Sequence, residues 1–464
     1  MNHPTTLAQR LWQSPVAWTW GFNALRVASG LLLLPLLVRL LTKDDLGMHY
    51  VLLSLGALAL MVDFGFAGSI WRAVCVALAG GKEIRAEGLA PAPDPAAQPC
   101  TELLWDVLTT TRTLYRRLAV VALLLLGCCG TFMVARHVQG TTSPETTWLA
   151  WALTLAGAVW EVYAGWWSTY LAALNRMVTF ARLNFLAHAL KLVLAASLLV
   201  IGLGLLAVPL AGLVATFAQR VLTRRACLQV LSTWPPPKHH EANSRMLLRV
   251  LWPNSWRQGI IGVGNYLGAN AAAFICLELF GLAATAQYGL SLQLLSVAQG
   301  MAASWTAVKW PEIAQHCARG DQAAMRRVFQ PRLWQQIVTF VLLAALLVPL
   351  AQPLLVWLGS NKEVLPAVWF ALLAVNTCLD MQFSAWGTLI STGNCIPVMW
   401  PALLGTLAGL ALALALIGNT ALGLGALALG PLLVGAAFNY WYWPLYGARV
   451  MGTSWVRFMF ERQA

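Results

Sequence analysis

The chain has 464 residues, of which 59% are hydrophobic and only 10% are charged, and its formal net charge is +13. Soluble domains contain about 25% charged residues, so this composition excludes an ordinary water-soluble globular protein. Long apolar runs recur along the whole chain and predict helices that span a lipid bilayer.

Twelve apolar stretches are each close to the roughly 20 residues that a helix needs to cross the hydrocarbon core. In chain order they are 18–41, 46–66, 117–136, 147–171, 183–203, 205–223, 252–277, 281–308, 332–358, 364–391, 396–417 and 423–447. The sequence therefore predicts an all-α integral membrane protein with about twelve transmembrane helices.

The distribution of lysine and arginine predicts the orientation of these helices. With both termini in the cytoplasm, 24 of the 30 cations fall in cytoplasmic segments and 4 in outer loops. This asymmetry follows the positive-inside rule, so the net positive charge is assigned to membrane orientation and no nucleic-acid partner is expected. The outer loops are too short for a catalytic domain, and the nine cysteines lack metal-type spacing. We therefore expect neither an enzyme nor a bound cofactor or metal.

Two cytoplasmic segments separate groups of spans. Residues 80–100 are rich in proline and alanine, and "TELLWDVLTTTRTLYRR" after them alternates apolar and polar residues at helical spacing. Such an amphipathic segment is expected to lie on the inner membrane face. The second segment, 232–250, contains "WPPPKHH", which is typical of a stiff linker.

The two halves of the chain resemble each other. An offset of 242 residues aligns Asn23 with Asn265, and an offset of 219 aligns Asn175 with Asn394. Both halves then contain six spans in the same orientation. Parallel repeats of this kind are related by an axis along the membrane normal and enclose a central cavity. We expect an N-terminal six-helix bundle over 1–231, a linker over 232–250 and a C-terminal bundle over 251–464.

Five ionisable residues remain inside the predicted spans: Arg26, Asp63, Glu161, Lys191 and Asp380. Their spacing from the cytoplasmic helix ends places them in the inner half of the membrane. Charged residues at such depth usually face a bundle interior or a wet cavity and pair with one another. We expect Arg26 to face the cavity and, without substrate, to pair with Asp63 or Asp380.

Simpler roles remain open for three of these residues. Lys191 could extend its ammonium group to the inner interface. Asp63 could cap its helix and pair with Arg72, and Glu161 and Lys191 could form a mutual ion pair that joins their helices. A carboxylate in a poorly hydrated cavity can also exchange protons, so Glu161, Asp380 and Asp63 are the candidate coupling residues.

The candidate substrate-binding residues are cations and amides on the first, fifth and seventh spans. An arginine fork matches the oxygens of a phosphate group, and the cations expected at the inner mouth, Arg220 among them, attract anions. The predicted set is Arg26, Asn23, Lys191, Arg257 and Asn265.

Three stretches carry a family resemblance. "LLVRLLTKDDLGMHYVLLSL", "YLAALNRMVTFARLNFLAHALKLVLAASLLVIGLG" and "KWPEIAQHCARGDQAAMRRVF" resemble, in this order, segments of the polysaccharide-biosynthesis flippases. These flippases belong to the multidrug/oligosaccharidyl-lipid/polysaccharide exporter superfamily. The resemblance implies two six-helix bundles in a V-shaped, MATE-like fold in the bacterial inner membrane. It also implies transport of an undecaprenyl-pyrophosphate-linked oligosaccharide, with Arg26 and Lys191 near the pyrophosphate and a polysaccharide polymerase as a possible partner.

A second reading is a proton- or sodium-coupled multidrug antiporter of the same superfamily. Such an antiporter is expected to carry a carboxylate in the middle of its first or seventh helix. Here the first span carries Arg26, and the seventh carries asparagines before Glu278 at its outer end. These residues favour the flippase, which moves its lipid-linked substrate from the cytoplasmic to the periplasmic leaflet by alternating access.

Overall fold

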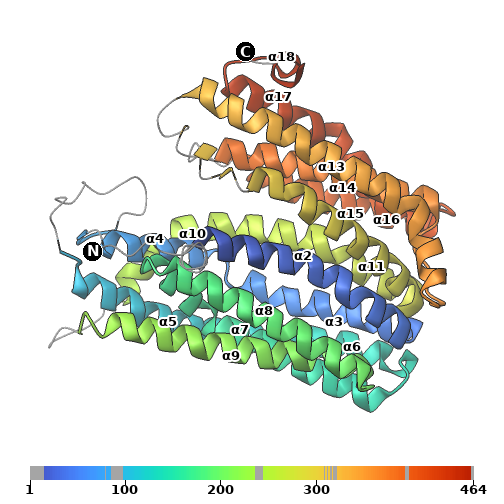
Figure 1. Cartoon of the computed structure of the whole chain (residues 1–464), viewed down its shortest axis with the longest axis horizontal. Helices are drawn as coiled ribbons and strands as arrows, with labels where there is room; N and C mark the ends of the chain where they lie inside the picture. The colour runs from blue at the N-terminus through green and yellow to red at the C-terminus, as the bar shows by residue number, and fades with distance from the viewer. Residues whose placement is uncertain are drawn as a thin grey trace, which may run out of the picture. The chain divides into compact units, whose positions relative to one another are not determined.

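The computed structural model describes residues 15–78, 80–84, 98–235, 244–307, 309–310, 312–313, 316, 321–391 and 397–460. These residues form helices joined by short turns, with no strand among them (Figure 1). By their internal contacts they group into two compact units, Met1–Tyr266 (unit 1) and Leu267–Ala464 (unit 2).

Unit 1 is a helical bundle built around α7. Its helices are α2 (Pro15–Leu40), α3 (Lys43–Val62), α4 (Phe66–Leu78), α5 (Thr101–Leu125), α6 (Thr131–His137), α7 (Pro144–Ala173), α8 (Met177–Val200), α9 (Ala207–Leu231) and α10 (Ser244–Tyr266). α7 packs against α3, α4, α5 and α9, while α8 lies between α2 and α9. Ser143 caps α7 ahead of a proline at its first turn, and Asn175, with φ of 60°, makes the turn into α8. Asparagine tolerates this left-handed conformation better than most residues.

Two helices of unit 1 differ from the sequence prediction. The segment from Thr101 does not lie apart as an interfacial helix, because it is continuous with the next span in α5. Its apolar residues Leu104 and Val107 are fully buried in a core shared with α4, α7 and α10. An amphipathic stripe suits a membrane surface and a protein core equally, so the sequence alone could not separate the two. α4 was not predicted, because Asp63–Gly65 break the apolar run before it.

α10 belongs to unit 1 by its contacts, although the predicted repeat assigns it to the second half. Ser255 donates a hydrogen bond to Ser69 on α4 (2.9 Å), and Tyr266 donates one to the carbonyl oxygen of Ser54 on α3 (2.9 Å). The Trp252 ring stacks on Phe64, 6.0 Å between centroids. The boundary between unit 1 and unit 2, at 266/267, lies inside the predicted seventh span. The predicted bundles 1–231 and 251–464 stay a prediction, and the proline-rich part of the linker lies outside the described residues.

Unit 2 repeats the arrangement around α14. It contains the π-helical turn η4 (Leu267–Ala271), α11 (Ala272–Ala307), α13 (Gln322–Trp357), α14 (Ala367–Ser391), α15 (Met399–Asn419), α16 (Ala426–Val434), the π-helical turn η6 (Gly435–Asn439), α17 (Tyr440–Val450) and α18 (Trp455–Phe460). α14 packs against α11, α13, α16 and α17. α11 is broken at Gly281, whose φ of 82° and ψ of −174° are accessible essentially to glycine alone. This break coincides with the predicted start of the eighth span.

Every predicted span coincides with a helix or a pair of consecutive helices. In the described part of the chain, eight helices are long and apolar enough to cross a membrane by length and composition. The remaining predicted spans correspond to α2, α3, α7 and α10 with η4. The all-α membrane fold is thus confirmed, whereas the count of twelve and the cytoplasmic location of the termini stay predictions.

Candidate functional site

An ion pair joins α7 to α9 inside the helical bundle of unit 1. Arg220 donates from Nη2 to Oε1 of Glu161 and from Nε to Oε2 (3.1 Å), so the guanidinium binds both carboxylate oxygens. Its Nη1 also donates to the hydroxyl of Ser168, two turns along α7 from Glu161. Gly165 lies between these two positions on α7, and a Cβ there would be 3.8 Å from the Glu161 carboxylate, an ordinary van der Waals contact.

Lys191 on α8 brings a second cation to this pair. Its side chain passes over Gly212 on α9, and its ammonium interacts electrostatically with Glu161. No hydrogen bond or ion pair of this ammonium is formed with any residue in the described ranges. On the opposite side, His49 on α3 is 4% exposed and interacts electrostatically with Lys191. We call Glu161, Ser168, Lys191, Arg220 and His49 the unit 1 polar cluster.

The face of α8 that carries Lys191 is polar over two turns. Asn184 accepts a hydrogen bond from the Gln219 amide of α9 (2.5 Å), and the His188 ring shares one with the Ser29 hydroxyl of α2 (3.1 Å). With Lys191 these residues follow the i, i+4, i+7 spacing of one helix face. α8 therefore lines up polar groups between α2 and α9 that extend the cluster along the bundle.

The cluster carries a net positive charge. Its one carboxylate, Glu161, is bound at both oxygens by Arg220, which leaves the charge of Lys191 without an equal counter-charge. A cation at such a position is costly in a bilayer unless a cavity, water or a ligand compensates it. The arrangement is therefore suited to attract an anion.

The structure gives Glu161 a different partner from the one considered in the sequence analysis. Glu161 pairs with Arg220 rather than with Lys191, and Arg220 lies inside α9, about 20 Å from its first residue and 17 Å from its last. Lys191 lies about 21 Å from the Met177 end of α8 and about 14 Å from the Val200 end. It is thus past the middle of its helix and does not reach the predicted cytoplasmic end.

Asp63 has a capping role in the described structure. One carboxylate oxygen accepts a hydrogen bond from Tyr115, and the other accepts one from the backbone N–H of Ala67 in the first turn of α4 (3.2 Å). The expected pairing with Arg72 does not occur among the described residues. Asp63 stands in the turn between α3 and α4, so its position is fixed by these two helices; its predicted coupling role stays untested.

The other substrate-binding candidates are not brought to the cluster. Arg257 and Asn265 are exposed on α10, and the Arg257 guanidinium lies over the Trp256 ring, 5.9 Å from its centroid. The side chains of Asn23 and Arg26 on α2 lie outside the described residues, so their role stays a prediction.

Trp160, next to Glu161, packs its ring against Phe217 of α9 (5.1 Å) and Tyr163 (5.6 Å).

Unit 2 carries a carboxylate at the position that the predicted repeat aligns with Glu161. The offset of 219 that aligns Asn175 with Asn394 also aligns Glu161 with Asp380 on α14. Asp380 is exposed in the structure and interacts electrostatically with Tyr440 of α17. The Tyr440 hydroxyl donates a hydrogen bond to Asn376, which lies one turn before Asp380 on α14 (2.8 Å). With this alignment the fourth predicted span of each half carries an acid, and Asp380 interacts with Tyr440 whereas Glu161 pairs with Arg220.

Sequence reasoning missed most partners of the cluster. His49, Ser168, Asn184 and Gln219 were not identified, and Arg220 was assigned only a steering role. The helical spacing of Asn184, His188 and Lys191 was a readable signal of a shared face. No comparable signal links Glu161 to Arg220, because 59 residues separate them.

No protein-family model matches the chain, and no curated protein matches it by sequence. Several solved structures are similar in fold over nearly the whole chain. An inward-facing multidrug resistance MATE family transporter of the MOP superfamily aligns with a TM-score of 0.63 at 15% identity, covering 92% of this chain and 94% of that one. A MATE transporter of Vibrio cholerae gives 0.59 at 17%, covering 97% and 98%.

A MOP superfamily transporter from Pyrococcus furiosus, whose description reports a binding pocket of reverse polarity, gives 0.51 at 14%, covering 97% and 99%. Identities this low establish the fold, and the narrower resemblance to polysaccharide-biosynthesis flippases stays a prediction. The chain has the fold of the MATE transporters of the MOP superfamily.

Proposed function

We propose that the protein is an alternating-access transporter that moves an undecaprenyl-pyrophosphate-linked oligosaccharide across the bacterial inner membrane. The observation that carries this proposal is the net positive charge of the unit 1 polar cluster. The substrate's pyrophosphate would supply the counter-charge that Lys191 lacks among the residues the structure describes. No cofactor and no covalent chemistry are involved, and a polysaccharide polymerase would use the product on the far side.

The state of Glu161 supports an anionic substrate. A transporter of lipophilic cations needs a carboxylate that can meet its substrate, but both oxygens of Glu161 are already occupied by Arg220. Releasing Glu161 would strand a guanidinium in the membrane interior, which costs several kcal/mol. The Pyrococcus furiosus relative, described as having a pocket of reverse polarity, is a precedent for different pocket charge within this fold.

A multidrug antiporter is the second candidate, and Asp380 is the observation that favours it. This exposed carboxylate on α14 has no arginine or lysine partner among the described residues, so it could meet a cationic substrate or a coupling ion. The described multidrug function of the inward-facing relative agrees with this candidate.

Competition between two probes tests the choice of substrate class. Undecaprenyl pyrophosphate is expected to change the intrinsic fluorescence of the purified, detergent-solubilised protein, which contains 23 tryptophans. Tetraphenylphosphonium, a lipophilic cation, is expected not to compete with it. Saturable binding of the cation without binding of the pyrophosphate lipid would instead support the antiporter.

Asp380 is the stronger candidate for proton coupling, because Glu161 is held by Arg220. We expect Asp380→Asn to remove the dependence of transport on a pH gradient, measured in proteoliposomes with and without an imposed gradient. Glu161→Gln is the matched comparison at the equivalent position of unit 1. An Asp380→Asn protein that responds to the gradient like the wild type would exclude the coupling role.

A further inference from the structure

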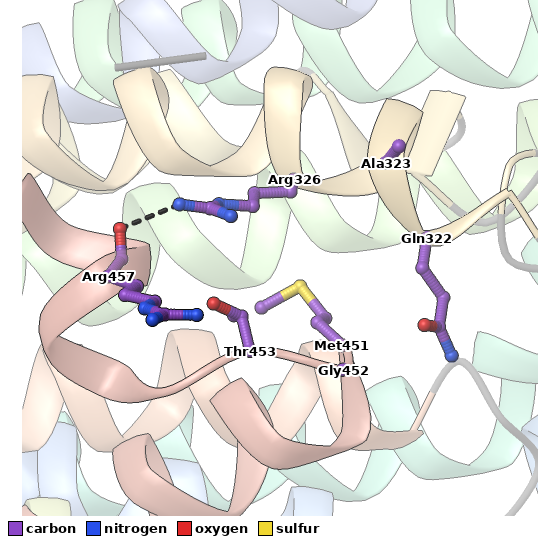
Figure 2. Close-up of a pocket in the computed structure, with 7 residues that line it drawn as sticks. All are labelled: Gln322, Ala323, Arg326, Met451, Gly452, Thr453 and Arg457. Carbon is purple, nitrogen blue, oxygen red and sulfur yellow. Dashed lines mark hydrogen bonds between the residues drawn. The ribbon is translucent and has the colours of Figure 1, made fainter. Parts of the chain in front are cut away.

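A polar pocket lies at one end of unit 2. It is formed by the first turns of α13, the end of α17 and the short helix α18, and its volume is about 330 Å³. Figure 2 shows Arg326 and Gln322 on the α13 side and Thr453 and Arg457 on the other side. Residues from the two sides of the pocket are thus more than a hundred positions apart in the sequence.

The pocket is built by specific contacts of α13 with the backbone of α18. Arg326 donates from Nη2 to the carbonyl oxygen of Arg457 (2.6 Å), and Trp334 donates to the carbonyl oxygen of Met459 (2.9 Å). Beneath them, Phe458 is fully buried in the core of unit 2, and the Arg326 guanidinium lies 5.9 Å from its ring centroid. α18 is therefore a fixed wall of the pocket.

The turn that enters the pocket requires glycine. Gly452 has a φ of 67°, and a Cβ there would lie 3.0 Å from the Gln322 side-chain oxygen. The backbone N–H of Gly452 bonds to the carbonyl of Arg449, and that of Thr453 bonds to the carbonyl of Ala448, which closes α17. This closing turn places Thr453 and Arg457 beside the start of α13.

The charges that line the pocket favour an anion. Arg326 is only 9% exposed, and Arg457 is exposed at the rim, so one guanidinium is held at the base and one is accessible. The pocket also borders the first turn of α13, whose unpaired N–H groups carry partial positive charge. The one carboxylate at this turn, Asp321, already accepts a hydrogen bond from the backbone N–H of Ala324 (2.9 Å). Guanidinium groups contributed from two sides of the pocket can match the oxygens of a phosphate.

Apolar side chains next to the pocket indicate where that phosphate comes from. Val456 and Phe460 of α18 flank Arg457 and are 61% and 67% exposed. They stand at the end of a helical bundle whose outer surface is apolar, so they are placed to contact acyl chains at a bilayer interface.

We propose that this pocket binds a phosphate group, presented by an anionic phospholipid of the surrounding bilayer. The lipid would seat its phosphate between Arg326 and Arg457, with Thr453 as a further donor and its acyl chains along Val456 and Phe460. The site is separate from the transport substrate, so this proposal does not depend on which substrate is moved.

Lipid binding to the full-length protein in detergent tests the proposal. Phosphatidylglycerol is expected to bind, measured by native mass spectrometry and by a rise in the unfolding temperature, and phosphatidylcholine is expected to bind much more weakly. Arg457→Gln removes the charge but keeps the carbonyl that accepts from Arg326, so the fold should be retained. It should weaken phosphatidylglycerol binding by about tenfold. The matched control is Arg449→Gln, which removes an exposed cation in the last turn of α17 and should leave binding unchanged.

The remaining outcomes overturn the proposal in distinct ways. Equal binding of phosphatidylcholine, whose phosphate charge is balanced by choline, would show that the pocket does not select an anionic phospholipid. Equal loss in Arg457→Gln and Arg449→Gln would show that Arg457 does not bind the lipid phosphate. Binding of inorganic phosphate or glycerol phosphate without binding of phosphatidylglycerol would contradict the lipid as the source. None of these readouts requires transport, so they remain informative if the proposed transport function fails.

Discussion

Arg220→Gln is expected to lower the stability of unit 1 more than any other single substitution of a charged residue in the cluster. It would leave the Glu161 carboxylate without its bidentate partner and the Ser168 hydroxyl without its donor. Breaking a buried ion pair by removing one partner costs about 3–5 kcal/mol. Because the Glu161 side chain is 31% exposed, the lower end of this range applies. The measurement is the temperature at which the detergent-solubilised protein loses its monodisperse peak in size-exclusion chromatography.

Two further variants isolate the ion pair from the loss of charge. Arg224→Gln, one turn further along α9 and exposed, is expected to leave this temperature unchanged. In Glu161→Gln combined with Arg220→Gln, neither member of the pair leaves a stranded charge, so much of the stability should return. A double variant as unstable as Arg220→Gln alone would mean that the arginine stabilises the bundle by packing rather than by pairing.

Lys191→Gln should reduce transport by about tenfold to a hundredfold without lowering stability. Its ammonium has no hydrogen-bonded partner in the described part of the protein, so its removal leaves no described group without a hydrogen bond. A hydrogen bond to a charged group, such as one to the substrate pyrophosphate, contributes about 1.5–3 kcal/mol. Restoration of surface polysaccharide in a flippase-deficient strain, at matched expression, measures the effect. Lys191→Arg keeps the charge but changes its shape, and should retain partial activity.

The matched control for Lys191→Gln is Lys309→Gln. Lys309 forms a partly exposed pair with Glu312 at 2.7 Å, outside the polar cluster, and its loss should leave transport unaffected. If Lys191→Gln restored polysaccharide fully while Arg220→Gln behaved as expected, the positive charge of the cluster would have no role in recognising the substrate. The anionic-substrate proposal would then lose its main support.

The positions of the spans could be predicted from hydropathy, but the ends of the helices could not. A span prediction ends where apolar character ends, whereas α9 continues through the charged residues Arg224 and Arg225 to Leu231. This extension is why Arg220 was assigned to a helix end and is found near the middle. The predicted boundary at 281 coincides with the break at Gly281, because Glu278 and Gly281 interrupt the apolar run there.

The residues of the candidate site were only partly predictable, for a related reason. Glu161 and Lys191 stand out as rare ionisable residues in apolar sequence, so burial cost alone identifies them. Their partners are set by which helices touch, and this depends on packing between segments far apart in the chain. The pairing of Glu161 with Arg220 rather than Lys191 follows from the close contact of α7 with α9, which hydropathy does not encode.

The membership of α10 in unit 1 has a consequence for how the protein is made. The buried core of unit 1 includes Leu251, and Trp252, Ser255 and Tyr266 fasten the same helix to α3 and α4. A nascent chain that has just finished its first six predicted spans therefore still exposes part of this core. Assembly of unit 1 must wait until Tyr266 has left the ribosome and α10 has been inserted, so the segment needed to complete unit 1 extends beyond the first six predicted spans.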